Sequence, residues 1–227
     1  MKNKTKFKKV DSINFIKGNV IFNFQFESKN SKTGGMAQVF MIPVQWAMES
    51  RIGDDSTVCF DCKFSNGKGC YVRKGDPMRG LTSKVKSLGR KLNSIPEFSS
   101  ELEEYILFMC EGKFIRFGAY GEPVLLGESL TAKICNTALG WTGYTHQWAL
   151  GKYSWSSKYF MASVEGDFVK RVANKMGFRT FLVGESEEKS VICPASAEAG
   201  RKVKCDKCTL CSGTEGKGNC NIKILPH

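Results

Sequence analysis

The sequence predicts an α/β protein whose largely parallel sheet forms an incomplete (β/α) barrel, with an N-terminal antiparallel hairpin and cysteine-rich metal loops. Strand-like and helix-like segments alternate over residues 113–193, which is typical of parallel βα units. Two strand patterns separated by glycines come before them, and the 10 cysteines are grouped rather than scattered. An open doubly wound sheet is the alternative arrangement of the same units.

The hairpin is expected from two neighbouring strand patterns. Residues 19–27 alternate, with phenylalanine at every second position from Phe22 to Phe26 and polar residues between, as in a strand with one exposed face. Residues 38–44 are more continuously apolar, as in a strand buried on both faces. The Gly-Gly pair at residues 34–35 separates the two strands.

Helices and further strands follow in order. Residues 81–92 form a basic amphipathic pattern, and Ser100-Glu-Leu-Glu103 resembles a capping box that opens a helix ending near Cys110. The later strands are expected at residues 113–117, 144–149, 159–164, 178–183 and 190–193, and the later helices at residues 131–139 and 167–176.

The length fits one domain with a short appendage. Residues 1–11 are basic and lack periodicity, so we expect a flexible arm, followed by a single α/β domain over residues 12–227. Within that domain, residues 53–80 form a cysteine-rich loop and residues 190–222 a C-terminal metal module.

The C-terminal cysteines carry the strongest chemical signal. Cys205, Cys208 and Cys211 form a C-x2-C-x2-C run, and Cys193 is followed by proline. Bacterial ferredoxins hold a [4Fe–4S] cluster with this pattern, because closely spaced thiolates wrap one cluster and a remote cysteine closes the fourth corner. Four thiolates also bind Zn²⁺, so the pattern predicts a metal and leaves both metals open.

A second cysteine group lies in the long loop. Cys59 and Cys62 form a C-x2-C pair, and Cys70 follows after seven residues. Three thiolates leave one position of a metal centre open or take a fourth ligand from elsewhere. The candidates for that fourth ligand are Cys110, Cys135 and Cys220.

The chain is basic, with 34 Lys and Arg against 22 Asp and Glu, a net charge of +12. Such a surface attracts phosphate backbones, so nucleic acid is the expected partner. The alternative is that the lysines compensate thiolate-ligated clusters or keep the surface soluble. The basic face of residues 81–92 supplies the candidate nucleic-acid contacts: Lys84, Lys86, Arg90 and Lys91.

Polar residues collect where the predicted strands end, which is where α/β folds place their chemistry. Arg116, Glu122, His146 and Glu165 are the candidate catalytic residues. The alternatives are that His146 is an ordinary core histidine, and that Arg116 neutralises a cluster or pairs with Glu122. Motifs of serine hydrolases, P-loop NTPases, zinc proteases, zinc deaminases and dinucleotide-binding enzymes are absent from the sequence.

No apolar stretch of the sequence is long enough to span a bilayer, so no membrane is expected. The basic start is not followed by an apolar segment, which predicts no signal peptide. Grouped cysteines then indicate metal ligands in a reducing cytoplasm rather than disulfides.

Several motifs resemble one family. Segments beginning at Arg116, Gly143, Phe160, Gly177 and Ile192 are similar, in that order, to the phage and plasmid "gene product 88" proteins. This resemblance implies a phage origin and hence the host cytoplasm.

The layout also distantly resembles radical S-adenosylmethionine proteins, which implies a partial barrel, a [4Fe–4S] cluster and S-adenosylmethionine. Those enzymes use Cys-x3-Cys-x2-Cys after the first strand, whereas the spacing here is Cys59-x2-Cys62-x7-Cys70.

Two functions follow from these observations. The first is an iron–sulfur protein of phage type, with radical-type enzyme activity on a nucleotide or nucleic acid as one interpretation of its role. The second is a non-catalytic, zinc-stabilised nucleic-acid-binding protein whose cysteine sites hold the fold together. Polar residues at strand ends and the open three-cysteine group favour the first function, and the basic charge favours the second. The sequence does not define the oligomeric state.

Overall fold

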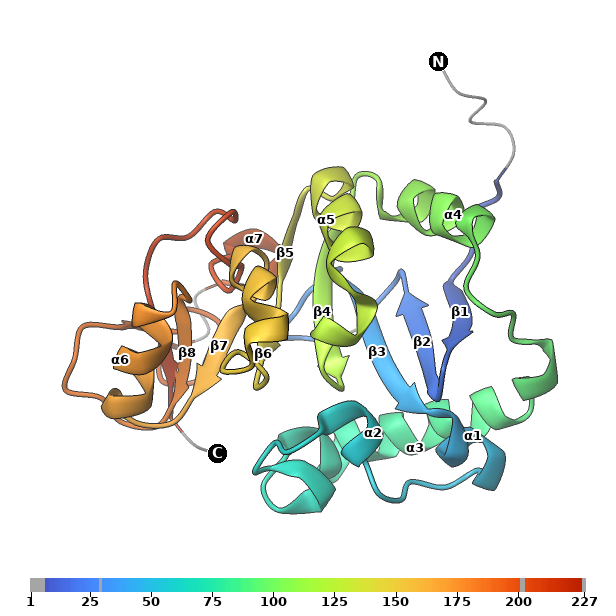
Figure 1. The fold of residues 1–227 in the computed structure, drawn as a ribbon, viewed down its shortest axis with the longest axis horizontal. Coiled ribbons are helices and arrows are strands. Elements are labelled where there is room, and N and C mark those ends of the chain that lie inside the picture. Colours follow the sequence, from blue (N-terminus) through green and yellow to red (C-terminus); the bar gives the residue numbers. More distant parts are fainter. Residues whose placement is uncertain (1–6, 29, 201–202, 226–227) are drawn as a thin grey trace.

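The computed structural model describes residues 7–28, 30–200 and 203–225. Two sheets lie side by side with helices around them, and neither sheet closes on itself (Figure 1). The strands are β1 (Ser12–Lys17), β2 (Val20–Gln25), β3 (Ala37–Pro43), β4 (Phe114–Tyr120), β5 (Gly140–Thr142), β6 (Tyr144–Thr145), β7 (Met161–Val164), β8 (Thr180–Val183), β9 (Val191–Ile192) and β10 (Ile222–Ile224). The mixed α/β class is confirmed, and a barrel stays a prediction.

The first sheet has the order β1-β2-β3-β4-β5. Strands β2 and β3 pair antiparallel, which confirms the predicted hairpin, and β4 and β5 continue the sheet in parallel. Strand β1 also pairs antiparallel with β2 and was not predicted. It carries the same alternation, with Ile13 and Phe15 buried.

The second sheet has the order β6-β7-β8-β10-β9, and all its pairs are parallel. Strand β10 inserts between β8 and β9, so the last strand of the chain completes the sheet. The sequence prediction missed β10, because three residues that follow a loop rich in Gly and Cys give too short a pattern. The two sheets are joined where β5 passes into β6 through Gly143.

Gly143 allows this passage. Its N–H donates to the Cys211 carbonyl at 2.9 Å, and its own carbonyl accepts from the Met161 N–H at 3.0 Å. A Cβ atom at this position would lie 2.7 Å from the ring of Phe160, so only glycine fits without a shift. The chain therefore changes sheets at a residue that also contacts the C-terminal cysteine loop.

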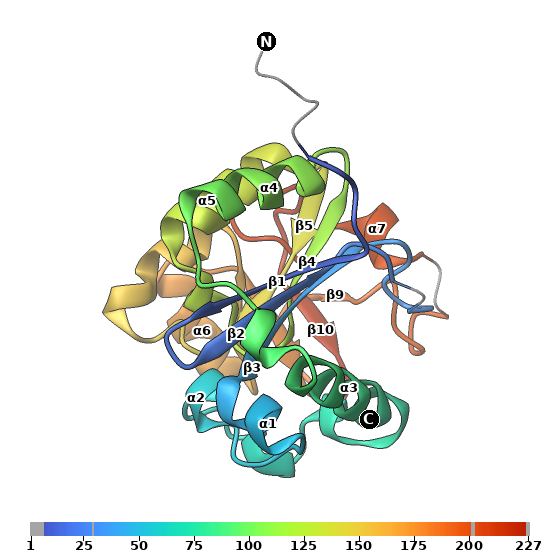
Figure 2. The same cartoon turned by 90° about the vertical axis from the view of Figure 1, so that its right-hand side faces the viewer.

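The helices are α1 (Val44–Glu49), α2 (Ser56–Cys59), α3 (Gly75–Gly89), α4 (Ser100–Cys110), α5 (Glu128–Thr137), α6 (Asp167–Lys175) and α7 (Cys205–Cys208). Helices α4 and α5 cover one face of the first sheet, while α1 and α3 lie on the other side (Figure 2). The capping residue of α4 is Ser99, whose hydroxyl accepts from the Leu102 N–H at 3.2 Å, one residue earlier than predicted.

The predicted loop over residues 53–80 contains α2 and the first turn of α3. The α3 helix begins at Gly75, six residues before the predicted start, because Gly80 and the first-turn Pro77 hide the pattern. Of the predicted arm, residues 1–6 lie outside the described residues. Phe7 stacks on Tyr105 of α4, with ring centroids 4.8 Å apart.

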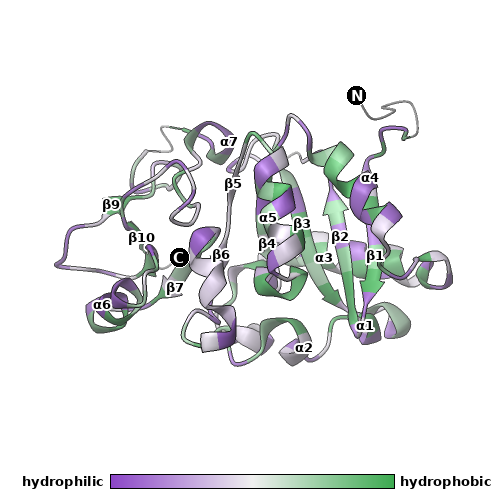
Figure 3. Ribbon diagram, turned by 45° about the horizontal axis from the view of Figure 1, so that its top comes forward, coloured by the Kyte–Doolittle hydropathy of each residue, from purple (hydrophilic) through white to green (hydrophobic). Residues whose placement is uncertain are grey.

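Apolar side chains form one large core and smaller separate ones. The large core fills the space between the first sheet and its helices, and the strands β2, β3 and β4 are mostly hydrophobic in Figure 3. A smaller core around Met161, Phe181 and Ile222 includes Cys193 and Cys211. Two of the C-terminal cysteines, Cys193 and Cys211, therefore belong to the core of the second sheet.

Candidate functional site

A cavity of ≈ 1180 Å³ is lined by residues of both sheets, of α3 and of the cysteine-rich loop. Ligand pockets in proteins are typically about 300–1,000 Å³, so this cavity is large enough to hold a small molecule of nucleotide size. Its chemically distinctive lining residues are Cys62, Tyr71, Lys84, Arg116, Tyr144 and His146.

A row of polar residues crosses the first sheet at the floor of this cavity. Gln25 pairs with Gln38, Gln38 with Arg116, and Arg116 with Thr142 on successive strands. Residues opposite one another on neighbouring strands point to the same face of a sheet. The polar face of the predicted strand over residues 19–27 is therefore turned to a cavity beneath α3.

Arg116 places a buried cation in this row. Its side chain is 8% exposed, and its Nη2 donates to the Tyr71 hydroxyl at 2.7 Å. The guanidinium carbon lies 6.0 Å from the centroid of the Tyr144 ring. Burial acts to lower the pKa of Arg116, but Tyr71, Tyr144 and two thiols together raise it above its usual value. No carboxylate of the described residues forms an ion pair with this guanidinium.

The structure pairs Glu122 with His146, whereas one interpretation of the sequence paired Glu122 with Arg116. The Nδ1 atom of His146 lies 2.8 Å from Glu122 Oε1, which also accepts from the His146 N–H at 3.0 Å. The Thr145 hydroxyl donates to the other carboxylate oxygen at 2.7 Å. Burial acts to lower the pKa of His146, but hydrogen bonds to Cys62 and Glu122 raise it to about 10.

Glu165 lies apart from these groups. It forms an ion pair of 2.7 Å with Lys63, whose side chain is exposed. Because Lys63 belongs to the cysteine-rich loop, this pair ties the loop to the end of β7. Glu165 is not among the residues that line the cavity.

The three cysteines of the long loop are neighbours. Burial raises the pKa of Cys59 far above its usual value, and the charges of Asp55, Cys62, Glu122 and Cys70 add to this effect. Cys62 and Cys70 line the cavity, and Cys62 is hydrogen-bonded to His146. The His146 imidazole is far from this loop in the sequence, so the spacing of the cysteines does not reveal that it lies beside them.

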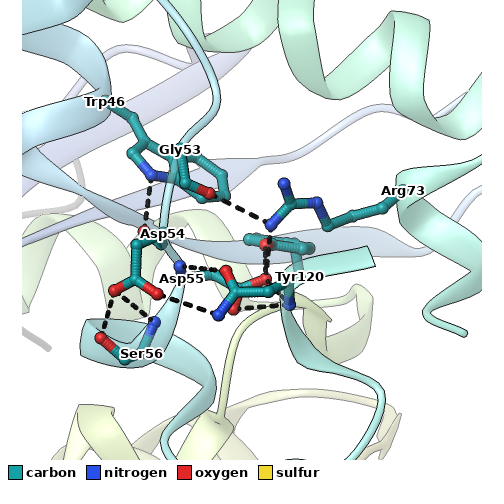
Figure 4. Close-up of polar contacts among 8 residues, drawn as sticks. Trp46, Gly53, Asp54, Asp55, Ser56, Arg73 and Tyr120 are labelled. Atoms are coloured by element: carbon teal, nitrogen blue, oxygen red, sulfur yellow. Dashed lines mark hydrogen bonds and ion pairs between the residues drawn. The ribbon is translucent and has the colours of Figure 1, made fainter. Parts of the chain in front are cut away.

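A buried carboxylate fixes both ends of this loop. Asp55, 1% exposed, accepts from Arg73 Nη1 at 2.8 Å, from the Tyr120 hydroxyl at 2.9 Å and from the Asn66 N–H at 3.0 Å (Figure 4). Arg73 also donates to the Gly53 carbonyl at 3.2 Å. Polar bonds therefore position the loop, together with the packing of Val58 and Val72 in the large core.

The C-terminal cysteines gather from two segments of the chain. Cys193 follows β9, while Cys205, Cys208 and Cys211 lie in and after α7. Cys193 and Cys211 are 5% and 8% exposed. Burial raises the pKa of Cys211, and the thiols of Cys193, Cys205 and Cys208 raise it further, so the four side chains lie near one another.

Arg179 holds the backbone around these cysteines. This buried guanidinium donates to the carbonyls of Leu210, Ser212 and Cys220 at 2.7–2.8 Å, and to that of Gly213 at 3.2 Å. One rigid fork thus fixes the loop on both sides of Cys211. Sequence reasoning did not single out Arg179, because its partners are backbone atoms more than 30 residues away.

All ten cysteines are free thiols. Within residues 7–28, 30–200 and 203–225, no set of three or more His, Cys, Asp or Glu side chains has the arrangement of a metal-ion site. Metal binding by either cysteine group therefore stays a prediction. The donor chemistry of the C-terminal group fits an iron–sulfur cluster, since four soft thiols from two segments lie near one another, two of them buried and two half-buried.

The remaining cysteines lie elsewhere. Cys110 and Cys135 are buried in the large core, where burial and the charge of Cys110 raise the pKa of Cys135. Cys220 is half-buried beside the C-terminal group, and its carbonyl accepts from Arg179. The structure therefore places Cys220, and not the other two, next to a predicted metal group.

The four candidate nucleic-acid contacts separate into two sets. Lys86, Arg90 and Lys91 are exposed. Lys84 instead points into the cavity, where its Nζ donates to Asn23 Oδ1 at 2.7 Å and to Gln25 Oε1 at 2.9 Å. Burial lowers the pKa of Lys84 to about 8.

Comparisons with protein-family models, curated proteins and solved structures find no match. The resemblance to the "gene product 88" proteins and the distant resemblance to radical S-adenosylmethionine proteins therefore stay predictions. Among the described residues, no helix has the length and hydrophobicity needed to cross a membrane.

Proposed function

We propose that the protein is an iron–sulfur enzyme, in which Cys193, Cys205, Cys208 and Cys211 ligate a [4Fe–4S] cluster. In this proposal the cavity lined by Arg116 and His146 holds the substrate. The observation that carries it is the gathering of these four thiols from two segments of the chain, with Arg116 close to two of them and lining the cavity.

The protein's own residues would hold the cluster in place. Arg179 fixes the carbonyls around Cys211, and Gly143 donates its N–H to the Cys211 carbonyl. These bonds preorganise the loop before any metal arrives, which is how outer groups support metal ligands. A bound cluster of this kind supplies one-electron chemistry.

The His146–Glu122 pair gives the cavity a group that can hold and move a proton. Glu122 engages Nδ1 of the imidazole, so Nε2 is the nitrogen left to exchange a proton with Cys62 or with a ligand. A buried carboxylate behind an imidazole stabilises the protonated ring. Arg116 would orient the substrate at the other side of the cavity.

Metal analysis of protein purified without oxygen tests this proposal. We expect about four irons and four sulfides per cluster, broad absorption near ~400 nm, and loss of that absorption on oxidation. A colourless protein with stoichiometric zinc would overturn the iron–sulfur proposal. It would favour instead the non-catalytic, zinc-stabilised role, in which the cysteine groups hold the fold together.

A further inference from the structure

We propose that the cavity is a nucleotide-binding site in which Arg116 and Lys84 hold the phosphate end of a mononucleotide. This deepens the proposed function by naming the substrate class, and it does not require that the metal is iron. The inference starts from two cations that share one cavity and lack acidic partners.

Arg116 carries the argument. Its side chain is more than nine-tenths buried, and its guanidinium offers five N–H donors. Among the described residues it has one hydrogen bond, to the Tyr71 hydroxyl. A buried charge without a carboxylate is costly unless a ligand completes its hydrogen bonds. The planar fork of arginine fits the oxygens of a phosphate.

Lys84 is the second cation. Its two hydrogen-bond partners, Asn23 and Gln25, are neutral amides, and its Nζ lies 4.3 Å from the centroid of the Phe40 ring. Acidic residues also line the cavity, namely Asp11, Glu27 and Asp76, but they are exposed at its rim. The cations therefore lie deeper than the acids, which is the arrangement that an anionic ligand requires.

The rest of the lining fits a base. Tyr144 packs on Phe181 with ring centroids 4.3 Å apart, and Tyr71 remains 59% exposed. An exposed aromatic ring such as that of Tyr71 can stack on a base. A cavity of ≈ 1180 Å³ has room for a whole mononucleotide.

One other explanation of Arg116 is that it only compensates a negative cluster, since Cys205 and Cys211 lie within its electrostatic reach. The two explanations differ in what the side chain contacts. A compensating charge affects the metal centre and leaves ligand binding unchanged. A phosphate ligand makes binding depend on Arg116 in protein with or without iron.

Calorimetric titration of the full chain tests the inference. The probes are AMP, GMP, CMP and UMP, the four matching nucleosides, inorganic phosphate and a 20-nucleotide single strand. We expect at least one monophosphate to bind more tightly than its nucleoside. Arg116→Gln should weaken that monophosphate about ten- to hundredfold, the range of a charge-assisted hydrogen bond, and leave the nucleoside unchanged.

Two further variants keep the test decisive. Tyr71→Phe removes the one hydroxyl that orients Arg116 and, because Tyr71 is largely exposed, should weaken the monophosphate severalfold in a folded protein. Arg51→Gln removes an exposed charge distant from the cavity lining and should change nothing.

Equal binding of nucleotide and nucleoside, binding of the single strand alone, or no binding by any probe would each overturn the inference. A changed metal centre with unchanged nucleotide affinity in Arg116→Gln would assign this residue to the cluster instead. Iron is measured in every sample. Nucleotide binding by a zinc or metal-free protein would leave the nucleotide site standing while the iron–sulfur proposal fails.

Discussion

The two cysteine groups use the same side chain in opposite settings. Cys193, Cys205 and Cys211 pack in a small hydrophobic core with Cys208 near them, and a buried arginine fixes the backbone around Cys211. Cys59, Cys62 and Cys70 lie on a loop that a buried carboxylate anchors at its ends, and two of them face the cavity. The first setting is closed and self-contained, as structural or electron-transfer centres require, whereas the second is open to a ligand.

This contrast shows that spacing points to candidate ligands, whereas the surroundings decide what role such a group would have. Both groups contain a C-x2-C element, yet only the cavity group has an imidazole and a carboxylate beside it. Breaking one group should therefore have consequences that breaking the other does not.

The largest effect is expected from Cys208→Ser. This change should remove the metal of the C-terminal group and lower the free energy of unfolding by several kcal/mol, because metal binding energy, on the order of 10 kcal/mol at structural sites, is also folding energy. Iron analysis and chemical denaturation measure both effects.

The matched control for that variant is Cys110→Ser, because Cys110 is a cysteine buried in the large core. It should keep all metal and lose only about 1–2 kcal/mol of stability for a buried hydroxyl. Equal metal content in the Cys208→Ser variant and in the unchanged protein would exclude Cys208 as a ligand.

Asp55→Ala should have the next largest effect. It leaves Arg73 buried without its partner and removes acceptors from Tyr120 and Asn66, so we expect a loss of about 3–5 kcal/mol by denaturation. The contrast predicts that C-terminal metal content is unchanged in molecules that remain folded. Asp54→Asn, an exposed neighbour in the same network, serves as control. Loss of C-terminal metal in Asp55→Ala would show that the two groups are coupled.

Arg179→Met should have a smaller effect on stability but a specific effect on the C-terminal group. Removing the fork frees four backbone carbonyls, which we expect to cost about 2–3 kcal/mol and to speed metal loss to a chelator. Arg171→Met, on the exposed face of α6, is the control. Unchanged chelation kinetics would mean that the loop holds its shape without Arg179.

The sequence supports the class of fold and the grouping of residues better than their surroundings. Alternation over residues 19–27 predicted β2, and strand ends marked Glu122 and His146 as candidate site residues. The partner suggested for Glu122 was Arg116, whereas the structure pairs Glu122 with His146. The same alternation does not show whether the polar side of the strand faces solvent or lines a cavity, because polar residues are found in both places. Lys84 was therefore assigned to an outer surface that the structure gives to Lys86 and Arg90.

Supporting residues were harder to find than ligands. Arg179 and Asp55 act through backbone atoms and through residues brought near by the fold, and neither has a motif of its own. Strand β10 was missed for a related reason. Its three residues are too short a pattern to predict a strand, and β10 forms through its pairing with β8 and β9.

The smallest expected effect is a pH dependence of monophosphate binding in the cavity. Burial lowers the pKa of Lys84 to about 8, so this amine loses its charge as pH rises through that value. Its contacts are the neutral Asn23, Gln25 and Phe40, while Arg116 keeps its charge and a phosphate monoester, with its second pKa near ~6, is already fully charged.

Of the other titratable groups that line the cavity, the paired His146 has a pKa raised to about 10, and Asp11, Glu27, Lys32, Asp76 and Lys91 lie at the exposed rim. Affinity for a monophosphate should therefore fall about fivefold between pH 7 and pH 9, roughly 1 kcal/mol for one partly screened charge. Lys84→Met keeps the shape and removes the charge, so its affinity should be lower at pH 7 and flat above it. A decline of equal size in Lys84→Met would assign the titration to Cys62, Cys70, Tyr71, Tyr144 or His146, which also line the cavity, and would remove Lys84 from the phosphate site.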